Sequence, residues 1–334
     1  MPEEGGRGRL RARFDILVRS TSRKAGTALR LLRAGDFNGL REGVLASGRS
    51  LRDFWHDQVA PLLPFTRPFH QPQNASTAAW QSVVGDLIDG AGRPLGDIVR
   101  EILPRLEGAG RVAVIVPCHD CHAHIDDTIA SVQRQSYRDI EIIIVDDGSD
   151  DARTSACLER LAGRRMRVIR QPNAGPAAAR NRGAEQAAEA DYLLFLDADD
   201  LLHEHAVTLL LWWLKANPAA AYAYPDQRFF GGKELLWQCQ DYNAYDLLWS
   251  NHPSVTALIR AAAFKEVGGF PAAVTRGEDW ALWQRLAAAG HHGTRFGAPL
   301  FLYRRHGENR SLSARRDDLV RQLHDAARPA YLPA

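Results

Sequence analysis

The chain has 334 residues, of which 45% are hydrophobic and 25% charged, an ordinary composition for a globular protein that builds its own core. Four cysteines are too few and too scattered for a disulfide scaffold, so we expect a reducing, cytoplasmic compartment. The chain shows no secretion-signal pattern and no apolar run long enough to cross a bilayer, and we expect no nucleic acid among its partners.

Positive charge is concentrated at the N-terminal end. Residues 1–50 hold eleven Lys/Arg against five Asp/Glu, although the net charge of the whole chain is only +2. Apolar residues at helical spacing, followed by a Pro-rich stretch at 61–76, predict a basic helical extension and linker over 1–110. This extension either packs on the main domain or forms a basic surface that touches anionic lipid at the inner face of the cell membrane.

From residue 111 onward, strand-like apolar runs alternate with helical patterns. We expect strands at 111–117, 140–149, 166–171 and 191–200, with helices at 151–163, 175–190 and 205–217 between or after them. This order predicts an α/β, Rossmann-like domain over 111–315, with a mostly parallel sheet covered by helices on both faces, and then a tail over 316–334. Ligands of such sheets bind beyond the carboxyl ends of the strands.

The segment "FLDADD" is the strongest local signal. It brings Asp197, Asp199 and Asp200 to a strand end, and the alternation of an extended strand would point Asp197 and Asp199 the same way. Neighbouring carboxylates repel each other and normally share a cation or a proton, and oxygen ligands suit Mg²⁺ or Mn²⁺. The alternative is a solvated acidic loop that caps the next helix.

Further candidates follow along the chain. Asp147, in "VDDGS", is placed to accept hydrogen bonds from a base or a ribose, or else belongs to a helix N-cap cluster. Arg180 lies in the first turns of a helix, where its guanidinium either binds a carboxylate or a phosphate, or is a surface charge. His306, near the end of the domain, is either a third metal ligand or a structural histidine.

A helix at 276–290 begins with Glu278 and Asp279. Acidic residues favour helix N-termini because the helix dipole stabilises them there, which is the simple explanation. The functional interpretation is a carboxylate base, Asp279, directed into a cleft beside Trp280.

In this order the segments resemble the family 2 glycosyltransferases of the GT-A fold. The resemblance covers roughly residues 111–315, and it rests on several segments that occur in the order typical of the family. They are "VAVIVPCHD", "SVQRQSYRDIEIIIVDDGSDD", "NAGPAAARNRG", "YLLFLDADD", "FKEVGGF", "GEDWALWQRLAAAG" and "YRRHGENRSLS".

The resemblance implies site residues position by position. It implies a catalytic base, Asp279, with Glu278 and Trp280 on the acceptor side. It implies metal binding, by Mn²⁺ or Mg²⁺, at Asp197, Asp199 and His306. The nucleotide-sugar contacts that it implies are Pro117, Cys118, Asp120, Asp147, Arg180 and Asp197.

The implied activity is inverting transfer of one sugar from a nucleotide-diphosphate sugar to a hydroxyl of a glycan or lipid-linked glycan acceptor. Processive members of the family usually carry a Q-x-x-R-W segment, and "YRRHG" departs from it, so we expect single-sugar transfer and not polymer synthesis. Acceptor specificity should lie within residues 225–255, which carry no pattern that we can interpret.

Two other functions remain open. A phosphatase of the haloacid dehalogenase type also has D-x-D after a strand, but it usually needs Thr or Val where this chain has Leu201. The second alternative is a non-catalytic sugar-nucleotide-binding protein, although every residue type that catalysis requires is present.

The segment "CHDCHAH" at 118–124 raises the question of zinc or thiol chemistry. No second C-x-x-C or distant His pair completes a usual zinc spacing. We interpret Cys118 and Asp120 as part of a nucleotide-binding loop, and Cys121 and the other histidines as incidental.

Overall fold

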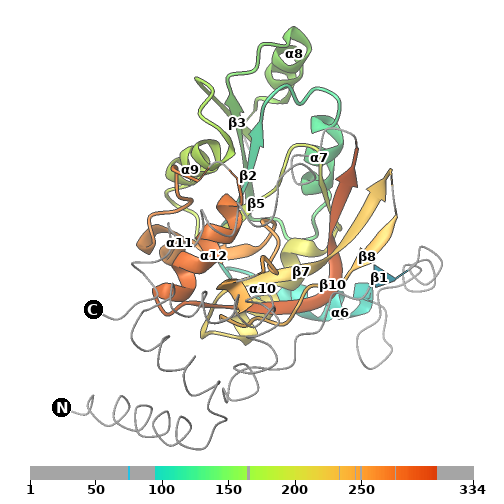
Figure 1. Ribbon diagram of the computed structural model, residues 1–334. Helices are drawn as coiled ribbons and strands as arrows, with labels where there is room; N and C mark the ends of the chain where they lie inside the picture. Colours follow the sequence, from blue (N-terminus) through green and yellow to red (C-terminus); the bar gives the residue numbers. More distant parts are fainter. Residues whose placement is uncertain are drawn as a thin grey trace, which may run out of the picture. The chain divides into compact units, whose positions relative to one another are not determined.

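The computed structural model describes residues 74–75, 95–163, 166–232, 234–244, 246–248, 250–274 and 276–306 (Figure 1). The predicted basic surface of residues 1–50, the Pro-rich linker apart from 74–75, and the tail 316–334 lie outside these ranges. Among the described residues, no helix combines the length and the apolar character that a membrane crossing requires.

The first half of the fold is a parallel sheet, as predicted. Its strands lie in the order β4, β3, β2, β5, and all three neighbouring pairs are parallel. Their bounds are β2 (Val112–Cys118), β3 (Ile140–Asp147), β4 (Met166–Gln171) and β5 (Tyr192–Phe195). The apolar runs of β2, β3 and β5 are almost completely buried, because helices cover the sheet on both faces.

Alternate residues of β2 enter two different cores. Val112, Val114 and Val116 join a cluster with α7 and α10, whereas Ala113 and Ile115 join a cluster with α9 and α12 (Glu278–Ala288). The helices that follow the four strands along the chain are α7 (Ile125–Gln133), α8 (Ala152–Leu161), α9 (Pro176–Gln186) and α10 (Ala206–Ala216).

Helix α9 lies unusually close to the sheet because of Gly183. A Cβ added at this residue would meet Ile115 Cγ2 at 2.4 Å, a distance that real side chains do not reach. Pro176 occupies the first turn of the helix, where its missing N–H costs nothing, as the sequence predicted. The close packing brings the first turns of α9 to the carboxyl ends of β2 and β3.

The second half of the sheet is antiparallel in most of its pairs, and the prediction of a mostly parallel sheet was wrong there. β9 pairs antiparallel with β5 and β7. β7 also pairs antiparallel with β8, because the connection between β7 and β8 is too short for a parallel crossover. β10 runs parallel to β7 and antiparallel to β6. The strands are β1 (Asn74–Ala75), β6 (Leu201–Leu202), β7 (Ala220–Gly231), β8 (Leu235–Trp237), β9 (Leu258–Arg260) and β10 (His292–Arg305).

The core of this domain begins before the predicted boundary at residue 110. Helix α6 (Leu95–Ile102) and the 3₁₀ helix η3 (Leu103–Leu106) bury Ile98, Ile102 and Leu106 in the same cluster as β2. Residues 95–106 were predicted as part of the extension, and their apolar side chains pack on the α/β domain, which was one of the two alternatives given for it.

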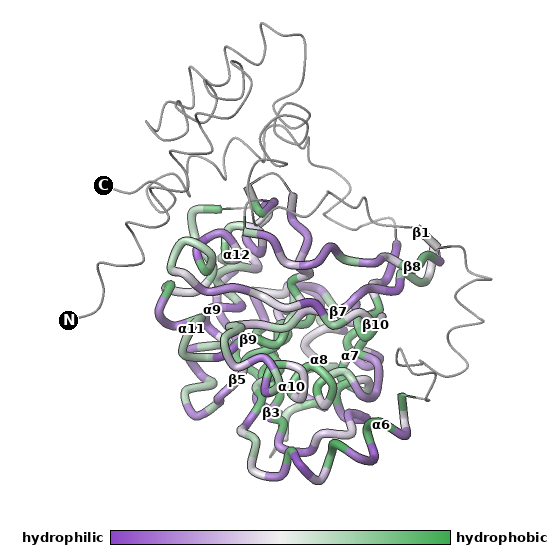
Figure 2. Tube along the Cα trace, turned by 90° about the horizontal axis from the view of Figure 1, so that it is seen from below, coloured by the Kyte–Doolittle hydropathy of each residue, from purple (hydrophilic) through white to green (hydrophobic). Residues whose placement is uncertain are grey.

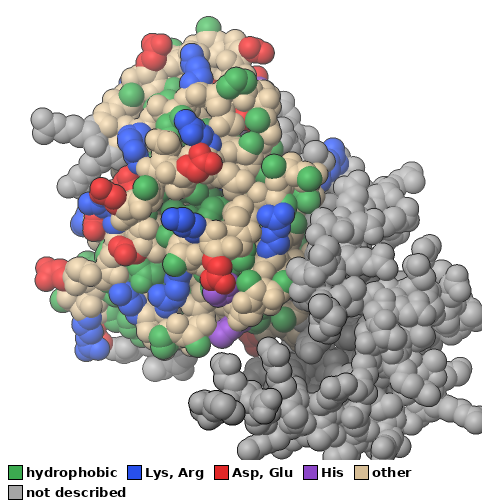
Figure 3. All heavy atoms as spheres, turned by 90° about the vertical axis from the view of Figure 1, so that its left-hand side faces the viewer, with side chains coloured by type: hydrophobic (Ala, Val, Ile, Leu, Met, Phe, Trp, Pro, Cys, Tyr) green, Lys and Arg blue, Asp and Glu red, His purple; other side chains and the backbone are tan. Residues whose placement is uncertain are grey.

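Three further helices complete the described chain. They are η4 (Asp246–Leu248), α11 (Ala261–Glu266) and α12 (Glu278–Ala288). The hydropathy colouring in Figure 2 shows a hydrophilic stretch along β7, whose first seven residues are buried and whose last five are not. On the face drawn in Figure 3, acidic and basic side chains are interspersed over the described residues, without an extended patch of either sign.

Candidate active site

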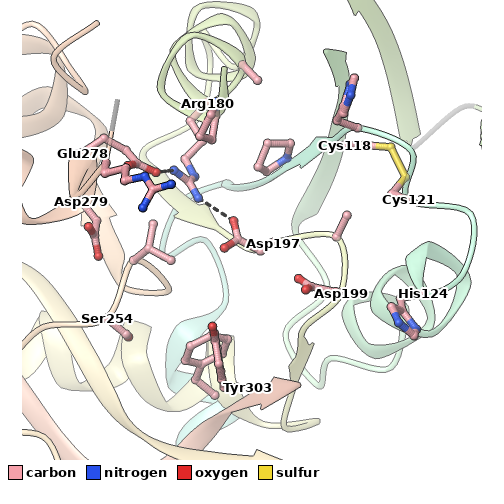
Figure 4. Close-up of a pocket in the computed structure, with 18 of the residues that line it drawn as sticks. Cys118, Cys121, His124, Arg180, Asp197, Asp199, Ser254, Glu278, Asp279 and Tyr303 are labelled. Carbon is pink, nitrogen blue, oxygen red and sulfur yellow. Dashed lines mark hydrogen bonds and ion pairs between the residues drawn. A yellow bond between two sulfur atoms is a disulfide. The ribbon is translucent and has the colours of Figure 1, made fainter. Parts of the chain in front are cut away.

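A cleft of about 1100 Å³ lies at the carboxyl edge of the parallel strands. Its walls are the loops after β2 and β5, the end of β3, the first turns of α9 and α12, residues 251–255, and one face of β7, β8 and β10. All predicted site residues except Trp280 line this cleft, although they come from segments far apart in the chain (Figure 4).

The loop after β2 contains a disulfide that the sequence reasoning missed. Cys118 and Cys121 are bonded, with their Cα atoms 5.6 Å apart, and both line the cleft. The interpretation of Cys121 as incidental was therefore wrong, whereas Cys157 and Cys239 are free. A C-x-x-C between a strand and a helix was the available signal.

Asp120 and Asp147 join neighbouring loops. Asp120 has φ 50° and its Oδ1 accepts hydrogen bonds from the N–H groups of Asp150 and Asp151, at 3.2 and 3.1 Å. Asp147 is 5% exposed and accepts from the N–H groups of Ala174 and Gly175, at 2.9 and 2.8 Å. Asp120 and Asp147, both predicted to contact the nucleobase, therefore join the loop after β2 to the start of α8 and the end of β3 to the segment before α9.

Arg180 ties two acidic motifs together. It is 4% exposed, and its guanidinium donates to Asp197 Oδ1 at 2.6 Å and to Glu278 Oε1 at 2.7 Å (Figure 4). The two carboxylates raise its pKa against the opposing effect of burial. Carboxylate binding was one of the alternatives given for Arg180, and these ion pairs fix α9, the loop after β5 and α12 together. The contacts of Arg180 with phosphate and of Glu278 with the acceptor stay predictions.

Asp199 pairs with His306, although the two residues are 107 positions apart in the chain. Both were predicted as metal ligands. His306 Nε2 lies 2.7 Å from Asp199 Oδ2, and the ring of His124 lies 5.5 Å from that of His306. Burial and the charges of Arg304 and His306 lower the pKa of His124, which keeps its ring neutral more readily. His124 was predicted to be incidental, yet it lies beside this pair.

The predicted reason for the proximity of Asp197 and Asp199 was wrong. Strand β5 ends at Phe195, and the two carboxylates belong to a turn in which Asp200 N–H donates to Asp197 O at 3.1 Å. Strand alternation therefore does not apply, and each carboxylate has a different partner. Asp200 is 1% exposed, and burial next to its two acidic neighbours raises its pKa well above the usual range.

Asp279 lies at the start of α12, facing the cleft. Gly277 precedes the helix with φ 70°, a left-handed conformation that suits glycine, and Asn251 Nδ2 donates to Asp279 Oδ2 at 2.8 Å. Burial, and then the charge of Glu278, raise the pKa of Asp279 to about 6, against the opposing effects of Asn251 and Arg180. Asn251 lies in a segment where the sequence offered no signal.

Trp280 does not occupy the predicted position. It is 4% exposed, does not line the cleft, and directs its indole N–H to Leu247 O. A stacking platform needs an exposed ring face, so the position of Trp280 does not support an acceptor-side role. The sequence pattern was that of an amphipathic helix, and Trp280 is on its buried side.

The donor atoms near Asp199 suit a metal ion that is shared with a ligand. Among the described residues, no three His, Cys, Asp or Glu side chains form a group that could hold a metal ion alone. Mg²⁺ is usually held by one or two carboxylates together with phosphate oxygens of the substrate, and Mn²⁺ accepts the same ligands. Asp199 and His306 fit a site of this kind, in which the protein supplies part of the metal ligands and the bound substrate supplies the rest.

Residues 113–269 match the family model of glycosyl transferase family 2. The chain contains a family 2 glycosyltransferase domain. An uncharacterized glycosyltransferase of Haemophilus influenzae is 37% identical over 94 residues, 27% of this chain and 37% of that protein. The uncharacterized glycosyltransferase EpsJ of Bacillus subtilis is 44% identical over 91 residues, 27% of this chain and 26% of that protein. The matched regions thus span well under half of these relatives.

Solved structures share the fold. TarS 1-349 of S. aureus, in complex with UDP-GlcNAc, matches with a TM-score of 0.56 at 17% identity, over 67% of this chain and 68% of that chain. The mannosyltransferase PcManGT of Pyrobaculum calidifontis, in complex with GDP-Man and Mn²⁺, matches with a TM-score of 0.52 at 19% identity, over 67% and 66%. The predicted GT-A fold of the glycosyltransferase domain is confirmed, and the phosphatase alternative is not favoured.

Proposed function

We propose that the domain transfers a single sugar from a nucleotide-diphosphate sugar to a hydroxyl of a glycan or lipid-linked glycan, with inversion at the anomeric carbon. The observation that carries the proposal is Asp279, a cleft carboxylate whose pKa is raised to about 6. A base with a pKa near the working pH combines a useful ionised fraction with good proton affinity.

In the proposed reaction, Asp279 accepts the proton of the acceptor hydroxyl. The acceptor oxygen then forms its bond to the anomeric carbon while the bond from that carbon to the diphosphate oxygen breaks, and the nucleoside diphosphate leaves with the electron pair. A single displacement of this kind inverts the configuration. Asn251 orients the carboxylate by its hydrogen bond to Oδ2, so that proton transfer and attack are aligned.

The opposite part of the cleft suits the leaving group. Asp199 and His306 would hold a divalent metal ion jointly with the diphosphate, as the bound GDP-Man and Mn²⁺ of PcManGT suggest by analogy of fold. Such an ion stabilises the negative charge that develops on the departing diphosphate. Asp197, held by Arg180, lies between Asp199 and Asp279 (Figure 4), which supports a contact with the donor sugar or ribose.

Donor binding and turnover test the proposal directly. The full chain is screened against UDP- and GDP-sugars, with and without Mn²⁺, by thermal shift, and the donor that stabilises it is used for calorimetry. We expect Asp199→Ala to abolish the Mn²⁺-dependent part of donor binding and to lower kcat by about 10²–10³. Unchanged metal-dependent binding in this variant would remove Asp199 from the metal site.

The stereochemistry is tested separately. Proton NMR of the first product formed should show an anomeric configuration opposite to that of the donor. Retention of the donor configuration would rule out the single displacement, even if the donor and the metal bind as proposed.

A further inference from the structure

Three aromatic side chains form one surface of the cleft, which we call the aromatic shelf: Phe229, Trp237 and Tyr303. They come from β7, β8 and β10, which lie side by side in the sheet. Phe229 pairs with Tyr303 in register, and Trp237 pairs with Gln227, two residues from Phe229. Because side chains alternate along a strand, this register places all of them on the same face.

The rings are arranged as a surface and not as a filled core. The planes of Phe229 and Trp237 are within 6° of parallel, with centroids 6.0 Å apart, and Tyr303 lies 5.2 Å from Phe229. All three are half-buried, so each ring packs on its neighbours and keeps part of its area open to the cleft. Aromatic residues that face a cleft without closing it are typical of ligand sites.

Polar groups border the aromatic shelf. Gln227 lines the cleft in the same rung as Trp237, and Ser254 and Asn251 line it on the side of Asp279. Arg305, the next residue on the same face of β10, holds its guanidinium over the Phe229 ring, 5.5 Å from its centre. The surface therefore combines a flat apolar area with hydrogen-bonding groups at its edges.

We propose that the aromatic shelf is the subsite that binds a pyranose ring of the acceptor saccharide. One face of a pyranose exposes C–H groups, which pack on aromatic rings, while its hydroxyls project from the rim toward polar groups. This inference rests on the proposed glycosyl transfer, and it identifies the recognised part of the acceptor as a sugar. An alkyl chain would fit a uniformly apolar groove better than this bordered surface.

The position of the aromatic shelf separates it from the donor. Figure 4 shows Tyr303 and Ser254 on the far side of Asp197 and Asp199 from the disulfide of Cys118 and Cys121. In the proposed function the nucleobase of the donor lies on the side of the disulfide. Asp279 lies on the same side of the cleft as Ser254. A sugar stacked on the aromatic shelf would thus approach the anomeric carbon of the donor from the side of Asp279, the proposed catalytic base.

Saturation-transfer NMR on the full chain tests the aromatic shelf with defined probes: the methyl glycosides of glucose, galactose, mannose and N-acetylglucosamine, and decyl phosphate as a lipid surrogate. We expect saturation at the ring C–H protons of at least one glycoside. We expect Trp237→Ala to weaken that interaction about tenfold, and Trp237→Phe to restore most of it. Trp212→Ala, the same change on α10 outside the cleft, is the matched control and should behave as wild type.

The outcomes separate the two proposals. If wild type binds the nucleotide sugar but no glycoside is saturated, or Trp237→Ala leaves the glycoside signal unchanged, the aromatic shelf is not the acceptor subsite. Saturation of decyl phosphate alone overturns the sugar assignment in favour of a lipid contact. If wild type binds no nucleotide sugar, the proposed function fails. Unaltered donor binding in Trp237→Ala, with a raised KM for the glycoside only, is the expected result.

Discussion

The cleft wall formed by the loops after β2, β3 and β5 is held together by a disulfide, ion pairs and backbone hydrogen bonds, whereas the wall formed by β7, β8 and β10 is a surface of ring contacts. On the first wall, Asp120, Asp147 and Asp197 each have fixed partners before any ligand arrives. On the second wall, the rings of Phe229 and Trp237 are only half-buried and keep part of their surface exposed. A preorganised wall suits a ligand of constant structure, and an open aromatic wall suits one whose attached groups vary.

Asp279 stands between the two walls, so its substitution should have the largest effect. Asp279→Asn removes the proposed base and should lower kcat by about 10²–10⁴, while donor binding measured by calorimetry stays within a factor of two or so. Asp139→Asn, an exposed residue just before β3, is the matched control. Equal turnover of Asp279→Asn and wild type would contradict the assignment.

The same residue predicts a pH profile. Because the base must be ionised and the pKa of Asp279 is raised to about 6, activity should fall as pH drops through about 6. The sign for stability is opposite: the ionised carboxylate is disfavoured by burial, so the free energy of unfolding of Asp279→Asn should exceed that of wild type above pH 6 and converge with it below the unfolded pKa.

Arg180 tests how far the first wall depends on its ion pairs. Arg180→Ala leaves Asp197 and Glu278 without their shared partner and should cost about 3–5 kcal/mol of unfolding free energy. Arg182→Ala, on the same helix, breaks only a pair whose side chains are 48% and 64% exposed, and should cost at most about 0.5 kcal/mol. Urea unfolding of both variants gives the comparison, and similar losses would show that the buried pairs are not special.

The disulfide gives the smallest expected effect. It closes a short loop, so Cys118→Ser with Cys121→Ser should lower the unfolding free energy by about 2 kcal/mol or less. Dithiothreitol should destabilise wild type by a similar amount and leave the double variant unaffected, with Cys157→Ser as the control. A wild type that does not respond to reductant would mean that the first wall is held by its polar contacts alone.

The first wall was largely predictable from sequence, for a physical reason. Buried parallel strands read as continuous apolar runs, and the acidic residues that end them, such as Asp147 and Asp197, must lie at one sheet edge. The position of the cleft follows from that geometry. The disulfide was the exception, since the short spacing of Cys118 and Cys121 allows pairing but does not require it.

The second wall could not be predicted because its register joins distant segments. Tyr303 and Phe229 are partners across β10 and β7, and nothing local to either residue reveals the pairing. The same holds for Arg180 with Glu278, whose side chains meet only in the folded domain. His306 and Asp199 differ, because the resemblance to the family had already grouped them as metal ligands. Trp280 shows the opposite kind of error. It was predicted to contact the acceptor because it follows the proposed base Asp279 in the chain, but its side chain is buried.

Gly183 gives this site a hidden sensitivity to mutation. No ligand needs to touch it, yet the bare backbone there sets the spacing between α9 and Ile115, and Arg180 is one turn earlier on the same helix. Any larger residue would lift the helix and with it the guanidinium that joins Asp197 to Glu278. In a random mutant library, inactivating changes would therefore gather beneath the cleft floor, at a residue that a map of substrate contacts would omit.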